Sequence, residues 1–297
     1  MTRSSDTYIR GHSYKCIGER DTNDGGFTHA KRIKHCIVRG LVITFLLISS
    51  LLGLLAAFPY LVAQGDAWAV PVGYKRKSNE TQVVRIVLTG GPCAGKSSAL
   101  TYLKRAAQNK GFDVITAPEI ATTMMNSGCA YNRSTPSQVL TFQSAIIALQ
   151  LQLERSLTDV ATSTGRPTIV IFDRGTLDVK GYVDAAMWKT LLDAHRMSEE
   201  HMLQRYDGVL HLVTAADGAL DFYKRGRVAD DSGHPVYRSE TPEEAILLDG
   251  KMQAAWKSHA RHVIIRNGGS FSVKLDETYR AMLSIVREIR LRNSDHM

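Results

Sequence analysis

A glycine-rich loop constrains the fold of this chain most: Gly90-x-x-x-x-Gly95-Lys96-Ser97 stands between an apolar run and a helical pattern. The β-branched run 83–88 predicts a buried strand before the loop, and residues 98–109 predict a helix after it. Glycines let the backbone curl, so that consecutive N–H groups and the positive end of the helix face one point. This order is typical of a phosphate-binding P-loop, and the alternative is a glycine-rich turn with a surface lysine.

The motif assigns chemistry to individual residues. Lys96 would reach the β- and γ-phosphates of a nucleotide, and the Ser97 hydroxyl would hold Mg²⁺. We expect the phosphate-binding residues to be Gly90, Gly91, Pro92, Cys93, Ala94, Gly95, Lys96, Ser97 and Ser98.

Composition and charge restrict the possible classes of protein. The chain has 297 residues, 44% of them apolar, which is enough for one large or two ordinary domains with a real core. Its net charge of +8 lies mostly in residues 1–79, which hold 11 basic and 5 acidic residues. We therefore expect no nucleic-acid partner for the rest of the chain. The four cysteines show no spacing typical of a zinc site or a disulfide framework.

An apolar segment near the N-terminus predicts a membrane anchor. Residues 41–63 contain no charged residue, and at about 1.5 Å per residue a helix of this length crosses a bilayer of roughly 30 Å. We expect a disordered basic segment at 1–40, a transmembrane helix at 41–63, a linker at 64–80 and one domain at 81–292. A cleaved signal peptide is the alternative, since Ala67-Trp68-Ala69 could serve as a cleavage site.

The topology of this anchor is ambiguous from the sequence. Basic residues between 31 and 39 lie close to the apolar segment and favour a cytoplasmic N-terminus, while the basic run 75–77 flanks the other side. A domain that uses nucleotides fits the cytosol better, so we expect it to face the cytosol. An organellar import role for the N-terminus is the open alternative.

From residue 81 onward, apolar runs alternate with helical segments. This alternation predicts an α/β domain with a five-stranded parallel sheet and helices on both faces. The predicted strands are 83–88, 112–116, 168–172, 209–213 and 263–265. Capping boxes predict helix starts after Thr135 and Thr241, and residues 279–289 predict a closing amphipathic helix. The polar, arginine-bearing stretch 223–239 predicts a mobile loop.

Charged residues stand at the ends of three predicted strands. Lys96 follows the first, Glu119 the second and Asp173 the third, and ligands of parallel sheets bind where such ends converge. We assign Asp173 to Mg²⁺ and Glu119 to the base that takes a proton from the acceptor. Arg174 would pair with phosphate or substrate through its planar guanidinium. The alternative for both carboxylates is a stabilising charge at a helix N-terminus.

The stretch 223–239 also carries candidate phosphate ligands. Arg225, Arg227 and Arg238 are predicted to close over the γ-phosphate as lid arginines, with Arg238 as the catalytic one. A solvated basic loop is the alternative. Trp188 and Trp256 are predicted to lie in the core.

These motifs together resemble one P-loop family. It joins the ribosylnicotinamide-kinase domain of NadR to the TRPL translocation defect protein, and is catalogued as an AAA domain although kinase-like in build. The resemblance rests on TGGPCAGKSS, PEIATTMMNSG and IVIFDRGTLD and covers about residues 83–283. It implies a P-loop NTPase fold that binds ATP or GTP with Mg²⁺. Arg266-Asn267 stand where the family often has Asp-Asn, so the sequence does not choose between ATP and GTP.

Two functions follow as expectations. The first is a membrane-anchored P-loop kinase or NTPase that transfers the terminal phosphoryl group to an unknown small-molecule acceptor. The second is a regulatory GTP- or ATP-binding protein in membrane trafficking, which is what the TRPL branch implies, with possible phosphoinositide contacts. The chain ends at Met297, soon after the last predicted helix, whereas that branch has a further C-terminal domain, so lipid binding is not carried over.

Overall fold

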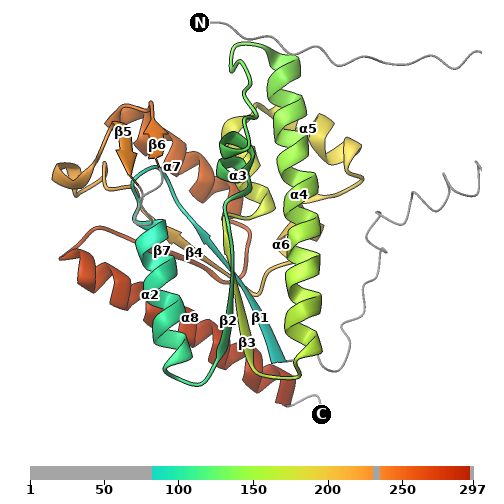
Figure 1. Cartoon of the computed structure of the whole chain (residues 1–297), viewed down its shortest axis with the longest axis vertical. Helices are drawn as coiled ribbons and strands as arrows, with labels where there is room; N and C mark the ends of the chain where they lie inside the picture. Colours follow the sequence, from blue (N-terminus) through green and yellow to red (C-terminus); the bar gives the residue numbers. More distant parts are fainter. Residues whose placement is uncertain (1–81, 230–234, 295–297) are drawn as a thin grey trace, which may run out of the picture. The chain divides into compact units, whose positions relative to one another are not determined.

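The computed structural model describes residues 82–229 and 235–294, with the backbone alone for 227–229, 235–238 and 293–294 (Figure 1). The predicted segments 1–40, 41–63 and 64–80 lie outside the described residues. Within the described part of the chain, no helix is both long and apolar enough to cross a bilayer.

A five-stranded sheet forms the centre of the fold, in the order β2-β3-β1-β4-β7. All four strand pairings are parallel. The strands are β1 (Val83–Thr89), β2 (Asp113–Ala117), β3 (Thr168–Asp173), β4 (Gly208–Leu212) and β7 (His262–Ile265). The five predicted strands and their parallel arrangement are confirmed.

Helices cover both faces of this sheet, because residues alternate in direction along each buried strand. On one face Ile86 of β1 packs with Leu103 of α2 (Lys96–Gln108) and Met282 of α8 (Phe271–Ser294). On the other face Val87 packs with Ile147 of α4 (Pro136–Ser163) and Trp256 of α7 (Pro242–Trp256). The prediction that helices cover both faces of the sheet is therefore confirmed (Figure 1).

Shorter elements complete the described chain. They are α3 (Ile120–Asn126), the 3₁₀ helix η3 (Thr176–Tyr182), α5 (Ala185–Ala194), α6 (Glu199–Leu203) and the 3₁₀ helix η4 (Leu220–Phe222). The closing helix α8 begins eight residues before the predicted 279, at Phe271. Most residues of its first two turns are exposed, so the sequence there has no helical period of apolar residues from which the start of α8 could be predicted.

The predicted mobile loop 223–239 contains a hairpin instead. Strands β5 (Gly226–Ala229) and β6 (Pro235–Arg238) pair antiparallel. The polar side chains of this stretch hide the period-2 pattern that signals a strand with one buried face.

The two predicted capping boxes have different outcomes. At Thr241 the box forms, with the Thr241 hydroxyl and the Glu244 carboxylate each accepting from the other's N–H. At Thr135 the helix starts as predicted, but the Thr135 side chain makes no cap bond. The Gln138 side chain accepts from Asn132 N–H instead.

Candidate functional site

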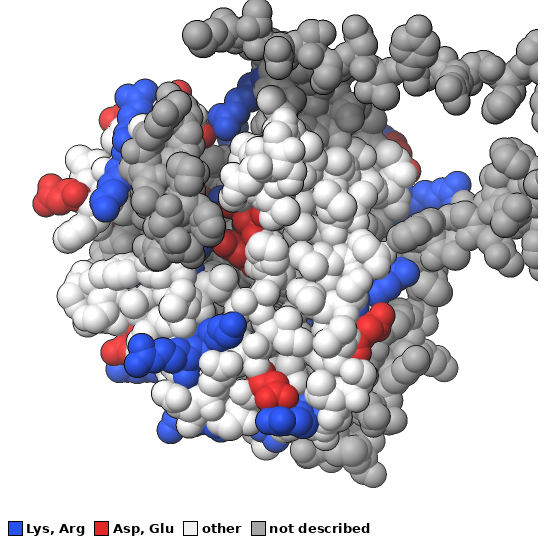
Figure 2. All heavy atoms as spheres, in the orientation of Figure 1, with Lys and Arg blue, Asp and Glu red and all other residues white. Residues whose placement is uncertain are grey.

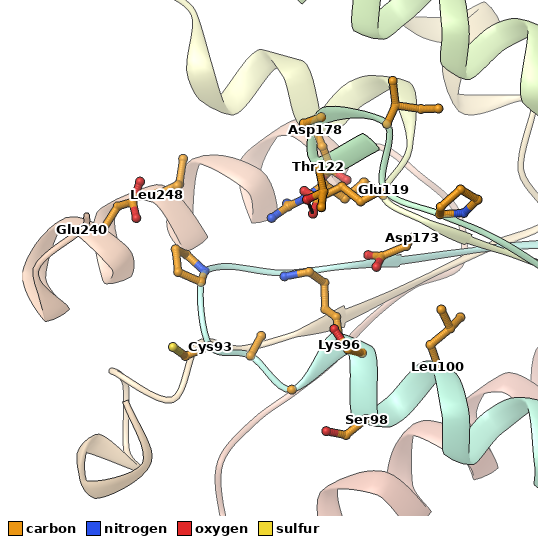
Figure 3. Close-up of a pocket in the computed structure, with 18 of the residues that line it drawn as sticks. Cys93, Lys96, Ser98, Leu100, Glu119, Thr122, Asp173, Asp178, Glu240 and Leu248 are labelled. Atoms are coloured by element: carbon orange, nitrogen blue, oxygen red, sulfur yellow. Dashed lines mark hydrogen bonds and ion pairs between the residues drawn. The ribbon is translucent and has the colours of Figure 1, made fainter. Parts of the chain in front are cut away.

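Three neighbouring strands end at one edge of the sheet and bring the predicted site residues together. The P-loop follows β1, Asp173 ends β3 and Glu119 follows β2, and the sheet order makes these strands neighbours. A cavity of about 840 Å³ opens at this edge. It is lined by the loop from Pro92 to Ser98 and by Glu119, Asp173 and Arg174 (Figure 3). Figure 2 shows acidic atoms in this hollow, between the places of α3 and α7 in Figure 1.

The P-loop adopts a curled conformation that only its residue types allow. Gly90 and Gly95 have φ values of 137° and 86°, which L side chains rarely adopt. A Cβ at Gly90 would lie 2.0 Å from the Leu212 carbonyl oxygen, so a side chain has no room there. Lys96 Nζ donates to the Gly90 and Gly91 carbonyl oxygens, at 3.0 and 2.9 Å. The ammonium therefore closes the loop at the first turn of α2.

An ion pair connects the ends of β2 and β3. Arg174 Nε donates to Glu119 Oε1 at 2.5 Å, and an Arg174 terminal nitrogen donates to the Gly90 carbonyl oxygen at 3.3 Å. The Thr122 hydroxyl donates to Glu119 Oε2 at 2.6 Å. Arg174 itself has a left-handed φ of 75°. Its guanidinium thus reaches both the predicted base and the P-loop.

Burial and charge shift the protonation of the clustered groups. Burial, and then the charge of Glu119, raise the pKa of Asp173 to about 6. Burial alone would raise the pKa of Glu119 as well, but the charges of Arg174 and Lys96 outweigh it and lower that pKa. Burial, and then the charge of Arg174, lower the pKa of Lys96 to about 8. Glu119 is therefore ionised, because nearby cations outweigh its burial. At Asp173 the nearby cations do not outweigh burial and the charge of Glu119.

Asp173 has a carboxylate oxygen without a partner, to which a cation could bind. Its Oδ1 is buried and has no hydrogen-bond partner among the described residues. In the same part of the chain, no group of three or more His, Cys, Asp or Glu side chains is placed to hold a metal. A P-loop magnesium ion depends on one hydroxyl, a nearby carboxylate and the phosphates. Exposed Ser97 and half-buried Asp173, whose Oδ1 is buried, supply the two protein groups of that set.

Of the three predicted lid arginines, Arg225 alone has a described side chain, and it does not line the cavity. Arg225 is exposed, and its Nε donates to the Ser239 carbonyl oxygen at 3.2 Å. Arg227 and Arg238 lie in β5 and β6, but their side chains are outside the described part. Cys93 at the tip of the P-loop does touch this region, since its Sγ donates to the Lys224 carbonyl oxygen at 3.2 Å.

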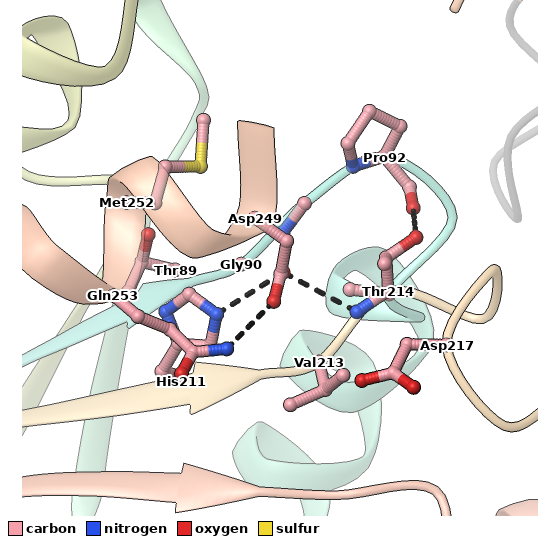
Figure 4. Close-up of polar contacts among 12 residues, drawn as sticks. Thr89, Gly90, Pro92, His211, Val213, Thr214, Asp217, Asp249, Met252 and Gln253 are labelled. Carbon is pink, nitrogen blue, oxygen red and sulfur yellow. Dashed lines mark hydrogen bonds and ion pairs between the residues drawn. The ribbon is translucent and has the colours of Figure 1, made fainter. Parts of the chain in front are cut away.

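Asp249 of α7, a buried carboxylate to which the sequence analysis assigns no role, holds the P-loop (Figure 4). Asp249 Oδ1 accepts from Gly91 N–H at 2.6 Å, Thr214 N–H at 3.3 Å and His211 Nε2 at 3.1 Å. Its Oδ2 accepts from Gln253 at 2.8 Å. Burial would raise the pKa of Asp249, but the hydrogen bond from His211 and the others outweigh it and lower that pKa. The hydrogen bond between Gly91 and Asp249 joins residues 158 positions apart, and no sequence motif predicts such a contact.

A second missed group is a buried lysine at the start of α8. Lys274 Nζ donates to the carbonyl oxygens of Ala94 and Val213 and to Asn267 Oδ1, at 3.0, 2.7 and 2.7 Å. The Asn267 amide nitrogen donates in turn to the carbonyl oxygens of Thr214 and Asp217, each at 2.7 Å. The amide of Asn267 therefore holds loops of the chain together.

A buried aspartate fixes the turn after β3. Asp178 Oδ1 accepts from the Thr89 hydroxyl at 2.5 Å and from Trp256 Nε1 at 2.9 Å. Its Oδ2 accepts from Gly175 N–H at 3.0 Å. Trp256 is fully buried and Trp188 is 4% exposed, which confirms the prediction that both belong to the core.

No curated protein matches this chain. Among solved structures, the crystal structure of NadR protein in complex with NR has a similar fold, with 13% sequence identity and a TM-score of 0.49. The match covers 70% of this chain and 53% of that one, so the chain spans about half the length of that protein. A family model described as AAA domain matches residues 85–274.

The match to the family model spans the P-loop, the strand ends and the start of α8, which is more than half of the chain. The five-stranded parallel sheet and its helices fit a P-loop NTPase of kinase-like build. Nucleotide binding is the activity that this loop supports in such folds. The chain belongs to the AAA domain family.

Proposed function

We propose that this chain binds ATP or GTP and transfers the terminal phosphoryl group to a hydroxyl of a small molecule. One observation carries the proposal: a single cavity holds the P-loop with Lys96 on one side and Glu119, Asp173 and Arg174 on the other. A nucleotide-binding loop with its metal ligand would need only the loop, Lys96 and Asp173. Glu119, which Arg174 holds at 2.5 Å, is the additional group that can act on an acceptor.

The transfer uses each of these groups. The acceptor hydroxyl oxygen attacks the γ-phosphorus while the bond to the β–γ bridging oxygen breaks, and the nucleoside diphosphate leaves with that electron pair. The hydroxyl proton goes to Glu119, which is ionised and so free to accept it. A low pKa suffices there because little covalent work falls to the base in a loose transition state. Lys96 and Arg174 stabilise the charge on the phosphate oxygens.

Bound Mg²⁺ would neutralise charge between the phosphates. Ser97 would hold it directly, and Asp173 would hold it directly or through water. The buried, unpartnered Oδ1 of Asp173 supports this assignment. Arg238 is proposed as the lid arginine on the basis of the family resemblance, with Arg225 and Arg227 beside it.

Replacing Glu119 by glutamine is expected to lower the rate of transfer by about 10²- to 10⁴-fold, because the proton acceptor is lost. Purified protein with labelled ATP or GTP, Mg²⁺ and a panel of hydroxyl compounds gives the measurement. Nucleotide affinity should change less than threefold. Glu277→Gln, an exposed glutamate of α8, is the matched control and should keep the full rate.

A nucleotide-dependent regulator in membrane trafficking is the second candidate. The contact between Cys93 and Lys224 favours it, because it joins the phosphate loop to the segment that leads into the hairpin. If no compound accepts phosphate, and if nucleotide protects residues 223–239 from protease, the regulator replaces the kinase. If the wild-type protein transfers phosphate to an acceptor and the Glu119→Gln variant does not, a purely regulatory function is excluded.

We propose that residues 41–63 anchor the domain 81–292 to a membrane through the linker 64–80, with the domain facing the cytosol. The uncharged apolar run supports this proposal. Full-length protein expressed in cells should stay with membranes after alkaline extraction. A chain beginning at residue 80 should be released. Recovery of the full-length chain in the alkaline supernatant would contradict the anchor, and protection of the domain from added protease would contradict the orientation.

A further inference from the structure

Three consecutive carbonyl groups of the P-loop are held from outside the loop. The carbonyl oxygens of residues 92–94 accept, in order, from the Thr214 hydroxyl at 2.5 Å, from Ala215 N–H at 3.3 Å and from the Lys274 ammonium at 3.0 Å. Figure 4 shows the first of these bonds, between Thr214 and Pro92. Two of the donors lie in the loop after β4 and the third lies in the first turn of α8. We call these three donors the outer frame of the P-loop.

The outer frame determines where the N–H groups of the loop point. In a trans peptide the C=O and the N–H point in opposite directions. Because the carbonyl groups of residues 92–94 face the frame, the N–H groups of Cys93, Ala94 and Gly95 point away from it. These three residues line the cavity, and none of their N–H groups donates to another described residue. The loop therefore presents three consecutive donors that can bind one anion.

The backbone of this loop needs support from its surroundings. Cys93 has a φ of 54°, which a residue with a side chain rarely adopts. Such a conformation persists only where the surrounding structure over-determines it. The two side chains of the frame are well placed to do so, since Thr214 is fully buried and Lys274 is 5% exposed. The frame therefore holds the loop in its curled shape before a ligand binds.

Lys274 acts on the loop and not on phosphate directly. An ammonium has three N–H groups, and Lys274 uses all three, on the carbonyl oxygens of Ala94 and Val213 and on Asn267 Oδ1. No N–H is left for a phosphate oxygen. Lys96 differs, because it makes two such bonds to carbonyl oxygens of the P-loop and keeps one N–H for a ligand.

We infer that Thr214 and Lys274 are positioning residues for the phosphate chain of the nucleotide. They hold the carbonyl groups of residues 92–94 outward, so that the N–H groups of residues 93–95 meet phosphate oxygens without rearrangement. A loop that already has its bound shape loses less conformational entropy on binding, and this raises affinity. The inference rests on nucleotide binding by the P-loop, and it does not depend on transfer to an acceptor.

Titration with three ligands tests the hydroxyl of the frame in the full-length protein. The ligands are the tighter-binding of ATP and GTP, inorganic triphosphate and the matching nucleoside, so that the phosphate chain is separated from the base. Thr214→Val keeps the shape of the side chain and should weaken binding of nucleotide and of inorganic triphosphate about 5- to 10-fold. Thr214→Ser keeps the hydroxyl and should restore both affinities to within about twofold of wild type. Nucleoside binding should be the same in all three proteins.

Thr168→Val is the matched control for Thr214→Val. Thr168 is 1% exposed at the start of β3, at the opposite edge of the sheet, and its hydroxyl donates to the Arg166 carbonyl oxygen at 3.0 Å. Its loss should lower the thermal midpoint and leave the affinities unchanged. If Thr214 has the same merely structural role, Thr214→Val will behave as this control does.

Lys274→Met tests the ammonium of the frame. It should weaken binding of nucleotide and of inorganic triphosphate by about 10- to 100-fold, because hydrogen bonds from a charged donor are lost. Arg280→Met removes a charge from an exposed position of the same helix and should keep both affinities within about twofold of wild type. If Lys274→Met does not fold, the Thr214 variants decide alone.

The pH profile gives a readout that a merely structural role of Lys274 would not change. Burial lowers the pKa of Lys274 to about 8, and the charged groups that face it are Asp249 of α7, which raises this pKa, and Lys96 of α2, which lowers it. A neutral amine has only two N–H groups, so one of the three acceptors loses its donor as the pH rises through 8. The affinity of the wild type for inorganic triphosphate should therefore fall above that pH.

The comparison with Lys274→Met separates this effect from the titration of Lys96, which is present in both proteins. The ratio of wild-type affinity to Lys274→Met affinity should shrink about threefold or more between pH 7 and pH 10. A constant ratio would overturn the role of the ammonium.

The remaining outcomes separate this inference from the proposed function. If the wild type binds nucleotide and both Thr214→Val and Lys274→Met bind it equally well, the inference fails and the proposed function stands. An effect seen with the nucleotide and missing with inorganic triphosphate also overturns the inference, because the two residues would then act on the base. If the wild type binds neither nucleotide nor inorganic triphosphate, the proposed function is rejected and the inference with it.

Discussion

Replacing Lys96 by alanine is expected to weaken binding of ATP and GTP by about 100-fold or more. The ammonium makes charge-assisted hydrogen bonds to phosphate oxygens, and the loss of two such bonds costs about 3 kcal/mol, which corresponds to this factor. Lys96 also closes the loop through the carbonyl oxygens of Gly90 and Gly91, so its removal loosens the anion site. Calorimetric titration with Mg²⁺ measures the change directly.

Lys104→Ala is the matched control, since Lys104 is exposed further along the same helix, α2. Its affinity for nucleotide should equal that of the wild type. Retention of affinity within threefold in Lys96→Ala would reject phosphate binding by this loop, and every later assignment with it.

Replacing Asp173 by asparagine is expected to lower the rate of transfer about 10³-fold and to abolish most of its dependence on Mg²⁺ concentration. The carboxylate lines the same cavity as the P-loop and its buried Oδ1 lacks a partner among the described residues, and a neutral amide holds a divalent cation poorly. Affinity for metal-free nucleotide should stay the same or increase, because a negative charge is removed from a site for anions. Rates and affinities measured across a magnesium series give both results.

The same variant should be at least as stable as the wild type at neutral pH. The pKa of Asp173 is raised to about 6 by burial and by Glu119, so the ionised carboxylate opposes folding above that pH. The advantage of asparagine should be present above pH 6 and vanish as the pH falls towards the ordinary carboxyl pKa of about 4. A lower midpoint in Asp173→Asn at pH 7.5 would mean that Asp173 has a structural role.

Local patterns sufficed for the strands, the P-loop and the meeting of Glu119, Asp173 and Lys96. A buried parallel strand is an unbroken apolar run, and the residue that follows it necessarily lies at the carboxyl edge of the sheet. The order β2-β3-β1 then makes the two carboxylates and the loop neighbours. Each of these inferences uses residues close together in the chain.

Local sequence patterns assign no role to Asp249 or Lys274, for a physical reason. Asp249 and Lys274 contact the P-loop from 158 and 180 positions away, on helices whose local patterns do not distinguish them from surface charges. Which charged side chains become buried and paired is a property of the packed molecule and has no local signature.

The hydrogen bond from Gly91 to Asp249 restricts how this loop varies among relatives. Position 91 is formally unrestricted in the P-loop pattern, yet a Cβ there would lie 2.8 Å from Asp249 Oδ1 and 3.0 Å from Asp249 Cβ. A relative that acquires a side chain at this position must shorten or lose the acid on α7. The two positions should therefore covary, and glycine at 91 paired with acid at 249 would mark the lineages that inherited this arrangement.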